Sequence, residues 1–563
     1  MRKIVLNASI VFFLFLSSCS SVQKTTKQPV IKNGMVVSAR EEASKIGVEI
    51  LKNGGNAFDA MIATEMALAV AYPYAGNLGG GGFMVYRKNN GEVGTLDFRE
   101  KAPKASYKDM FLDEKGTVIK NKSTHSASAI GVPGTIAGIF AVHEKYGSLP
   151  MNQILKPVIE LAKKGIVITK KQEEQLKKHQ EELIFANGNN SLLSQTYKEN
   201  DTIKYLQLAE TLTRISKNGK NEFYKGETAI KLIQYISDHN GIMTLEDLQN
   251  YQPVWRKPVT FEYKNLKIHS MAPPSSGGIT LGQILQMIEP FQVGQYPHNS
   301  EKYIQIITEA ERRAYADRNH YIGDPDFVSV SQSQLLDKAY LKNRMNNFSF
   351  VKATPSTQIS NGTISNNEST ETTHYSIVDA FGNAVSVTTT LNGGFGSKLY
   401  CDELGFFLNN EMDDFSVKPG VPNSYGLIGG KANAIAPNKR MLSSMTPTIV
   451  EKNNQLFMVL GSPGGSTIIT SILQTILNVS EYNMSMQQAV DAPRFHHQWL
   501  PDEIVFEPNL FSKKIIQIIK KLGYITQEKK AVVLGKVDAI KIMEDKSLQG
   551  GADHRGDDAA VGY

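Results

Sequence analysis

The sequence predicts a globular protein of the α+β class, in which a largely helical first part is followed by strands of an antiparallel sheet. Of the 563 residues, 41% are hydrophobic and 21% are charged, which supplies ample apolar material for a large core. Helical periodicity dominates residues 154–236, whereas residues 372–390 have the pattern of a β-hairpin. The length suggests about three to four domains or one intertwined fold, and the composition excludes a mainly disordered, collagenous or coiled-coil chain.

The first twenty residues predict an export signal. Arg2 and Lys3 precede a mostly apolar run, residues 4–16, which is shorter than a membrane-spanning helix requires. The run ends in Leu-Ser-Ser-Cys at Cys19, which resembles the bacterial lipobox, where the cysteine is lipidated and becomes the new N-terminus. An ordinary cleaved signal or a short anchor is the alternative.

We therefore expect an exported lipoprotein, periplasmic or on the cell surface. Residues 1–18 are the predicted signal peptide, and residues 19–34 are a polar tether that begins at the lipidated Cys19. Because no other segment is long and apolar enough to cross a bilayer, the lipid is the only membrane attachment expected. Ser20 after the cysteine suits an outer-membrane location in a two-membrane bacterium.

Charge, cysteines and histidines argue against several other functions. A formal net charge of +6 over 563 residues is too dilute to indicate a nucleic-acid partner. If Cys19 holds lipid, Cys401 has no disulfide partner, and with no base nearby in the sequence it is interpreted as a packing residue rather than a nucleophile. His496 and His497 point apart on a strand and no third ligand is evident, so we expect no metal and no cofactor.

The first helices and strands follow from spacing and from glycine. Residues 40–71 predict two helices separated at residues 52–55, the second nearly apolar all round, as in a helix buried between layers. Residues 76–83 hold four successive glycines, but no Gly-Lys-Ser/Thr follows, so close backbone approach is favoured over phosphate binding. Strands are expected at residues 83–86 and 93–98.

The middle of the chain is helical and ends in a polar segment. Residues 170–182 are charge-dense and predict a solvated helix face, and two further helices are expected at residues 279–288 and 302–317. Residues 352–371 are rich in Ser, Thr, Asn, Pro and Gly, which predicts an exposed, flexible loop.

A hairpin should follow this loop, with a turn at residues 380–383. Paired positions then sum to about 763, so Thr373 faces Thr390 with Thr372 one step away, and facing Cβ atoms lie roughly 5 Å apart. Plain β-propensity explains each threonine equally well when it is considered alone.

The junction of loop and strand suggests a nucleophile. A hydroxyl needs a base to take its proton, and an N-terminal α-amino group can serve, because its ordinary pKa is about 7.7–8.0. Cleavage between Glu371 and Thr372 would create such an amine beside the Thr372 hydroxyl.

Several motifs in order resemble those of the γ-glutamyltranspeptidases. The likeness runs from about residue 35 to the C-terminus. The motifs that carry it are residues 76–83, 97–100, 273–278, 372–376, 408–415, 443–448, 461–466 and the final Gly562-Tyr563.

The resemblance implies an N-terminal-nucleophile hydrolase fold, a four-layer αββα sandwich of two stacked antiparallel sheets between helices. The precursor would cut itself at Glu371–Thr372 into a large subunit, residues 35–371 after the tether, and a small subunit, residues 372–563, which stay intertwined as a heterodimer. Thr372 would then attack the γ-glutamyl amide of a compound such as glutathione. Water, an amino acid or a dipeptide would resolve the ester.

The resemblance also implies how the donor is held. Arg99 should grip the substrate α-carboxylate with paired hydrogen bonds, and Ser443 and Ser444 should donate to the same group. A surface salt bridge to Glu100 is the alternative for Arg99.

An acidic pair, Glu411 and Asp414, should receive the α-ammonium with help from Asn392. Two neighbouring carboxylates repel each other, so a cation bound between them would be favourable. Some relatives have Gln in place of Glu411.

Further positions match the catalytic machinery. Gly464 and Gly465 match the oxyanion hole, where backbone N–H groups approach because no Cβ intrudes. Thr390 matches a second threonine that hydrogen-bonds Thr372, and Tyr425 lies in a segment that matches a lid loop.

Two other functions stay open. A β-lactam or other amide acylase on the same scaffold would keep the Thr-headed strand, but it would not need Arg99, the acidic pair and both serines together. A substrate-binding lipoprotein that no longer cuts itself is the other alternative, and the intact Thr372 and Thr390 argue against it.

Overall fold

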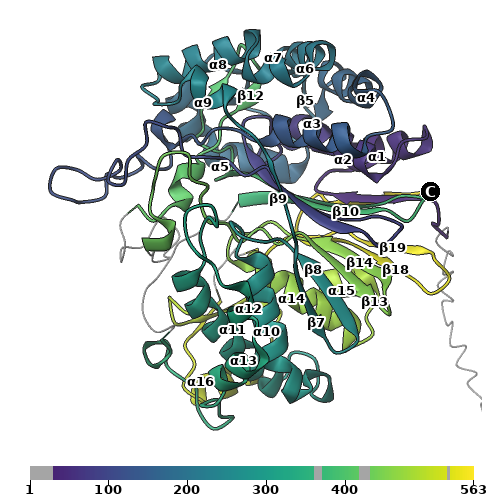
Figure 1. The fold of residues 1–563 in the computed structure, drawn as a ribbon, viewed down its shortest axis with the longest axis vertical. Coiled ribbons are helices and arrows are strands. Elements are labelled where there is room, and N and C mark those ends of the chain that lie inside the picture. Colours follow the sequence, from purple (N-terminus) through teal and green to yellow (C-terminus); the bar gives the residue numbers. More distant parts are fainter. Residues whose placement is uncertain (1–29, 361–370, 418–430, 529–532) are drawn as a thin grey trace, which may run out of the picture. The chain divides into compact units, whose positions relative to one another are not determined.

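The computed structural model describes residues 30–360, 371–417, 431–528 and 533–563. Residues 31–563 form one compact unit, so one intertwined fold accounts for the length. Two antiparallel sheets lie face to face between two helical layers (Figure 1), which confirms the predicted four-layer α+β sandwich.

Both sheets combine strands from before and after residue 372. The first sheet has the order β20 (Ala559–Gly562), β1 (Met35–Ser38), β9 (Glu371–Val378), β10 (Ala384–Asn392), β2 (Gly81–Arg87), β3 (Val93–Asp97), β6 (Val254–Arg256). The second has the order β19 (Leu548–Gly551), β18 (Asp538–Ile542), β14 (Gln455–Gly461), β13 (Thr448–Lys452), β8 (Leu266–Ser270), β7 (Val259–Tyr263). A cut before residue 372 would therefore leave two interleaved fragments.

The first helical layer lies above the sheets in Figure 1 and contains α1 (Glu41–Lys52), α2 (Ala57–Ala71), α3 (Thr135–Tyr146), α4 (Met151–Lys164), α5 (Lys170–Asn187), α6 (Leu206–Asn218), α7 (Lys220–Tyr224), α8 (Glu227–Asp238) and α9 (Leu245–Gln249). The second layer contains α10 (Gly277–Ile288), α11 (Glu301–Tyr321), α12 (Gln332–Leu335), α13 (Lys338–Arg344), α14 (Thr467–Ser480), α15 (Met486–Asp491) and α16 (Lys513–Lys521). Minor strands are β4 (Ile166–Val167), β5 (Thr202–Ile203), β11 (Tyr400–Cys401), β12 (Phe406–Phe407), β15 (Phe495–His496), β16 (Ile504–Phe506) and β17 (Thr526–Gln527).

Helix α2 is buried along its whole length, as its apolar sequence predicts, and it packs on β9 and β10. Its N-terminus is fixed by a capping box between Asn56 and Asp59. The predicted close approach of the glycine run is also confirmed. A Cβ on Gly80 would lie 2.1 Å from the Thr390 carbonyl oxygen, and one on Gly82 would lie 2.5 Å from the Thr388 carbonyl oxygen.

The hairpin of β9 and β10 forms, but its register differs by one residue from the prediction. Thr373 lies opposite Thr389, and an irregularity between Thr389 and Asn392 then brings Asn392 opposite Glu371. The reason is a longer turn, in which the Asp379 carboxylate accepts the backbone N–H groups of residues 381 and 383. The expected neighbourhood of residues 372 and 390 survives this change.

The predicted exposed loop 352–371 needs correction in part. Thr354, Ser356 and Ile359 in it are buried, and residues 361–370 lie outside the described residues. Helix α5 has the predicted solvated face, on which Lys177 and Lys178 are exposed, and it buries Leu176 and Leu183 on its other side.

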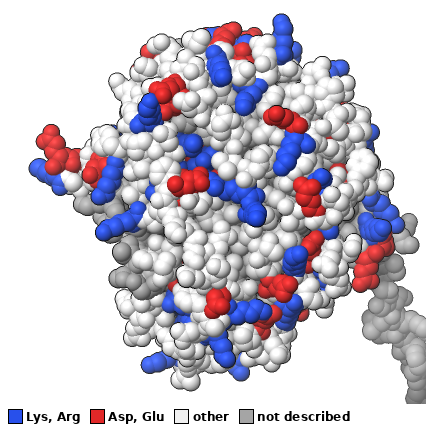
Figure 2. Space-filling view, viewed as in Figure 1, with Lys and Arg blue, Asp and Glu red and all other residues white. Residues whose placement is uncertain are grey.

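Charged side chains of both signs are interspersed on the face that Figure 2 shows. Among the helices of the described ranges, none combines the length and the apolar character that crossing a bilayer requires.

Candidate active site

A pocket of about 220 Å³ lies where β9 begins and β10 ends. It brings together nine of the residues that the sequence singles out, from segments as far apart as residues 99 and 465. Its lining residues are Arg99, Thr372, Thr390, Asn392, Glu411, Asp414, Ser443, Ser444, Met445, Gly465 and Ile468.

Thr372 and Thr390 share this pocket because the hairpin places them at the same edge of the first sheet. Thr372 is the second residue of β9 and is 5% exposed. The hydroxyl oxygen of Thr390 accepts the Asn392 backbone N–H at 2.7 Å, which fixes its orientation. His374, two residues beyond Thr372, is buried beside Thr388 and Ser376, and burial lowers its pKa to about 3. This imidazole is therefore neutral near the nucleophile.

Arg99 lines the pocket and is buried, so it does not lie on the surface. Its guanidinium is 1% exposed and pairs through Nη1 with Glu411 and through Nη2 with Asp414. Glu100 also forms an ion pair with Nη1, at 3.6 Å, but both side chains are buried, so the alternative is wrong about the surface location of this pair. Nη2 also donates to the carbonyl oxygen of Leu442 at 3.2 Å. The cation of the predicted donor site thus pairs with both of its acids in the empty pocket.

The three carboxyl groups around Arg99 are hard to ionise together. Burial raises the pKa of Glu100 to about 7, against the lowering effect of Arg99. Burial, together with the nearby Glu100 and Asp414, raises the pKa of Glu411 well above its usual range. An added cation in the pocket would therefore be favourable.

Ser443 and Ser444 are held by the segment that contains the Pro-Pro-Ser-Ser motif. The Ser276 backbone N–H donates to the Ser443 carbonyl oxygen at 2.7 Å, and the Ser275 hydroxyl donates to the Met445 carbonyl oxygen at 2.6 Å. Both pocket serines are 3% exposed. The motif at residues 273–278 thus braces the serines against the second sheet.

Gly464 and Gly465 connect β14 to α14. Their φ angles are +128° and +58°, a backbone region that favours glycine. Gly465 lines the pocket, and a Cβ on Gly464 would lie 2.5 Å from the Thr467 hydroxyl oxygen. Because these residues precede α14, the positive end of the helix dipole lies at this loop, where it favours a developing anion.

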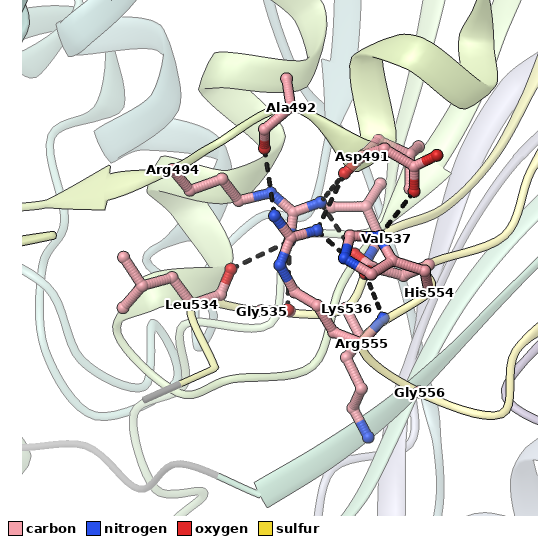
Figure 3. A network of polar contacts seen from close by, with 12 residues as sticks. Asp491, Ala492, Arg494, Leu534, Gly535, Lys536, Val537, His554, Arg555 and Gly556 are labelled. Carbon is pink, nitrogen blue, oxygen red and sulfur yellow. Dashed lines mark hydrogen bonds and ion pairs between the residues drawn. The ribbon is translucent and has the colours of Figure 1, made fainter. Parts of the chain in front are cut away.

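A polar network around Arg494 holds residues 534 and 535 in place (Figure 3). Arg494 donates to the carbonyl oxygens of Leu534 and Gly535 at 3.0 and 3.1 Å and pairs with Asp553 at 2.8 Å. Lys536 then donates its backbone N–H to the Ser462 hydroxyl at 3.0 Å. Residues 534–536 therefore pack against the loop that carries Gly464.

The other predicted residues lie elsewhere. Tyr425 and Cys19 fall outside the described residues, and for Glu371 only the backbone is described. Cys401 is buried in β11, away from the pocket, and burial raises its pKa to about 12. This agrees with a packing role.

The two adjacent histidines have separate partners. His496 contacts Thr470 and Gln498, whereas His497 contacts Asp502. Within residues 30–360, 371–417, 431–528 and 533–563, no three His, Cys, Asp or Glu side chains form a group that could hold a metal ion.

Two pocket-lining residues, Met445 and Ile468, were not predicted as site residues. A third residue, Glu100, was considered only as a surface partner of Arg99, but it is buried beside it with neither carboxylate oxygen hydrogen-bonded. All three residues lie within or next to the matched motifs, and this proximity is the one feature of the sequence that could have indicated them. Which side chains face the pocket is set by long-range packing.

Comparisons with known proteins agree with this geometry. A family profile described as gamma-glutamyltranspeptidase matches residues 43–563. The glutathione hydrolase proenzyme of Escherichia coli (strain K12) is 45% identical over 548 residues, which cover 96% of this chain and 94% of that relative. A protein of the same name from Pseudomonas aeruginosa is 41% identical, with 93% and 94% covered.

Solved structures support the same assignment. Helicobacter pylori gamma-glutamyltranspeptidase superposes with a TM-score of 0.58 at 42% identity, covering 60% of this chain and 97% of that one. A cephalosporin acylase from Bacillus halodurans shares the fold, with a TM-score of 0.82 at 24% identity and 98% and 99% covered. The family profile, the relatives and the Helicobacter pylori structure together establish that this chain belongs to the gamma-glutamyltranspeptidase family.

Proposed function

We propose that this protein is a self-processing γ-glutamyltransferase and glutathione hydrolase with Thr372 as its nucleophile. The observation that carries the proposal is the joint presence of Thr372 and the Arg99–Glu411–Asp414 ion cluster in one pocket. A γ-glutamyl donor is a zwitterion at its α-carbon, so it offers one partner to the cation and one to the acids. An uncharged acyl group would offer neither.

Donor binding exchanges ion pairs. The α-carboxylate binds Arg99 and the hydroxyls of Ser443 and Ser444, and the α-ammonium binds Glu411 and Asp414 with the Asn392 side chain. The ion pairs that Arg99 forms with Glu411 and Asp414 in the empty pocket break, and each of these charged groups then pairs with an opposite charge on the substrate. This exchange avoids an unpaired buried charge, which is costly.

In the proposed reaction the α-amine of Thr372 takes the proton of its own hydroxyl while Oγ attacks the γ-carbonyl carbon. The N–H groups of Gly464 and Gly465 stabilise the oxyanion. The C–N bond then breaks, the leaving amine takes the proton, and a γ-glutamyl ester remains on Thr372. Water or the amine of an amino acid or dipeptide attacks this ester and restores the enzyme, while Thr390 orients the hydroxyl.

Maturation uses the same oxygen. The Thr372 hydroxyl attacks the Glu371 carbonyl carbon, the peptide C–N bond breaks, and an ester joins the two segments. Water opens the ester, which leaves a carboxylate on Glu371 and a free amine on Thr372. The large and small subunits remain interleaved through both sheets.

The proposal includes export and lipid anchoring at Cys19. Replacing Cys19 with Ser should move the protein from the membrane to the soluble fraction. Unchanged membrane association of this variant would contradict the anchor.

The experiment compares the wild type with Thr372→Ala and, as a matched neighbour, Thr373→Ala. The wild type should yield two bands on a denaturing gel and release para-nitroaniline from L-γ-glutamyl-para-nitroanilide. Thr372→Ala should remain one inactive band, whereas Thr373→Ala should be cut and active. Normal cleavage or turnover by Thr372→Ala, or wild-type turnover of a β-lactam amide but not of the γ-glutamyl anilide, would overturn the proposal.

A further inference from the structure

Arg318 is a buried guanidinium behind the pocket serines. It lies on α11, is 1% exposed, and is not itself among the pocket-lining residues. Its Nε donates to the Ser276 hydroxyl at 2.9 Å, and its Nη2 donates to the Ser444 hydroxyl at 3.3 Å. Nη1 donates to the side-chain oxygen of Asn319 at 2.7 Å. One side chain therefore contacts both the bracing segment and a pocket serine.

The direction of these hydrogen bonds is fixed by chemistry. A guanidinium has only donors, so Ser276 and Ser444 must accept from Arg318. The Ser276 hydroxyl keeps its own proton, which it donates to the Ser443 carbonyl oxygen at 2.8 Å. The Ser444 hydroxyl likewise keeps its proton and cannot give it back to Arg318.

The consequence concerns the α-carboxylate of the donor. Ser444 lines the pocket, so a hydroxyl that accepts from behind has its proton available for an anion in front. Ser443 is placed through its main chain by Ser276, which is itself oriented by Arg318. The buried positive charge of Arg318 also favours an anion beside Ser444.

We propose that Arg318, acting through Ser276 and Ser444, is a positioning residue that sets the affinity of the pocket for the substrate α-carboxylate. The inference rests on the proposed function, because it assigns the serines to that carboxylate. It adds Arg318 and Ser276 to donor recognition, although neither contacts the reacting atoms.

The experiment uses three para-nitroanilides as probes. The γ-glutamyl anilide carries both α-groups, the glutaryl anilide carries the carboxylate without the ammonium, and the γ-aminobutyryl anilide carries the ammonium without the carboxylate. The variants are Arg318→Gln, Arg318→Lys and Ser276→Ala. Arg313→Gln is the matched control, because Arg313 is also buried on α11 but pairs with Glu309.

Arg318→Gln should raise KM about tenfold for the two carboxylate-bearing anilides, because hydrogen bonds to a charged group weaken. KM for the γ-aminobutyryl anilide, kcat and self-cleavage should stay within about twofold of the wild type. Arg318→Lys should lose less, since it keeps the charge but not the fork of donors. Arg313→Gln should leave the ratio of the three KM values unchanged.

Equal KM changes for all three anilides, or none, would overturn the inference. If Arg318→Gln does not fold, the Ser276→Ala variant tests the inference instead. It removes the hydroxyl that connects Arg318 to the Ser443 carbonyl oxygen and leaves the guanidinium in place. Its carboxylate-specific rise in KM supports the inference, and an unchanged KM refutes it. A wild type that turns over no γ-glutamyl anilide refutes the proposed function instead, so the two failures are distinguishable.

Discussion

Replacing Asp414 with Asn separates the two halves of donor recognition. Asp414 pairs with Nη2 of Arg99, and its side chain is 5% exposed. The variant keeps the size and the hydrogen-bonding oxygen of the side chain but removes the charge offered to the α-ammonium. Arg99 still has Glu411 as a partner, so no buried cation is left unpaired.

The magnitude follows from the loss of a charged hydrogen bond. Such a bond contributes about 1.5–3 kcal/mol net, which corresponds to a KM about 10- to 150-fold higher for the γ-glutamyl anilide. The glutaryl anilide has no ammonium, so its KM should stay the same or fall, because Arg99 is less neutralised in the empty site. Steady-state kinetics with both anilides measures this contrast.

Asp413→Asn is the matched control. Asp413 lies in the same turn, but its carboxylate accepts from the Ser123 hydroxyl and does not line the pocket. This control should leave both KM values within about twofold of the wild type. If Asp414→Asn weakens both anilides equally, or affects neither, the assignment of Asp414 to the ammonium is refuted.

Two further predictions concern the glycine loop and a buried acid. Gly464→Ala should lower kcat about 10²- to 10³-fold with little change in KM, because the variant displaces a backbone N–H donor of the oxyanion hole. The φ of +128° at residue 464 is unfavourable for alanine, and the added Cβ would lie 2.5 Å from the Thr467 hydroxyl oxygen. An unchanged kcat would contradict the assignment of Gly464 to the oxyanion hole. Glu65 accepts from the Tyr375 hydroxyl at 2.7 Å, and burial raises its pKa from 4.5 to about 7. The stability that protonated Glu65 contributes is present below pH 4.5 and is lost as the pH rises through about 7. The free energy of unfolding of the wild type should therefore fall by about 3 kcal/mol across that pH range, relative to that of Glu65→Gln. Denaturant unfolding at both ends measures the difference, and a pH-independent difference would contradict it.

Local patterns predicted much of the fold. The helices at residues 41–52 and 57–71, the glycine run and the hairpin follow from spacing, turn chemistry and backbone freedom. The one-residue register difference arises because the Asp379 carboxylate extends the turn to residues 379–383, which composition does not reveal.

The site itself depended on the family resemblance. Spacing suggested Thr372 and Thr390, but Ser443 and Ser444 alone look like a turn. The mutual pairing of Arg99 with its acids, and the contact of Arg318 with Ser444, join residues more than a hundred positions apart. Such contacts are set by how two sheets and a helical layer pack, which no local pattern encodes.

Self-cleavage before Thr372 is tested most directly by the N-terminal sequence of the smaller fragment of the purified, active protein. We expect this fragment to begin at Thr372, with Thr-Thr-His-Tyr-Ser. A fragment that begins at another residue, or one unbroken chain that still hydrolyses glutathione, would refute Thr372 as the N-terminal nucleophile.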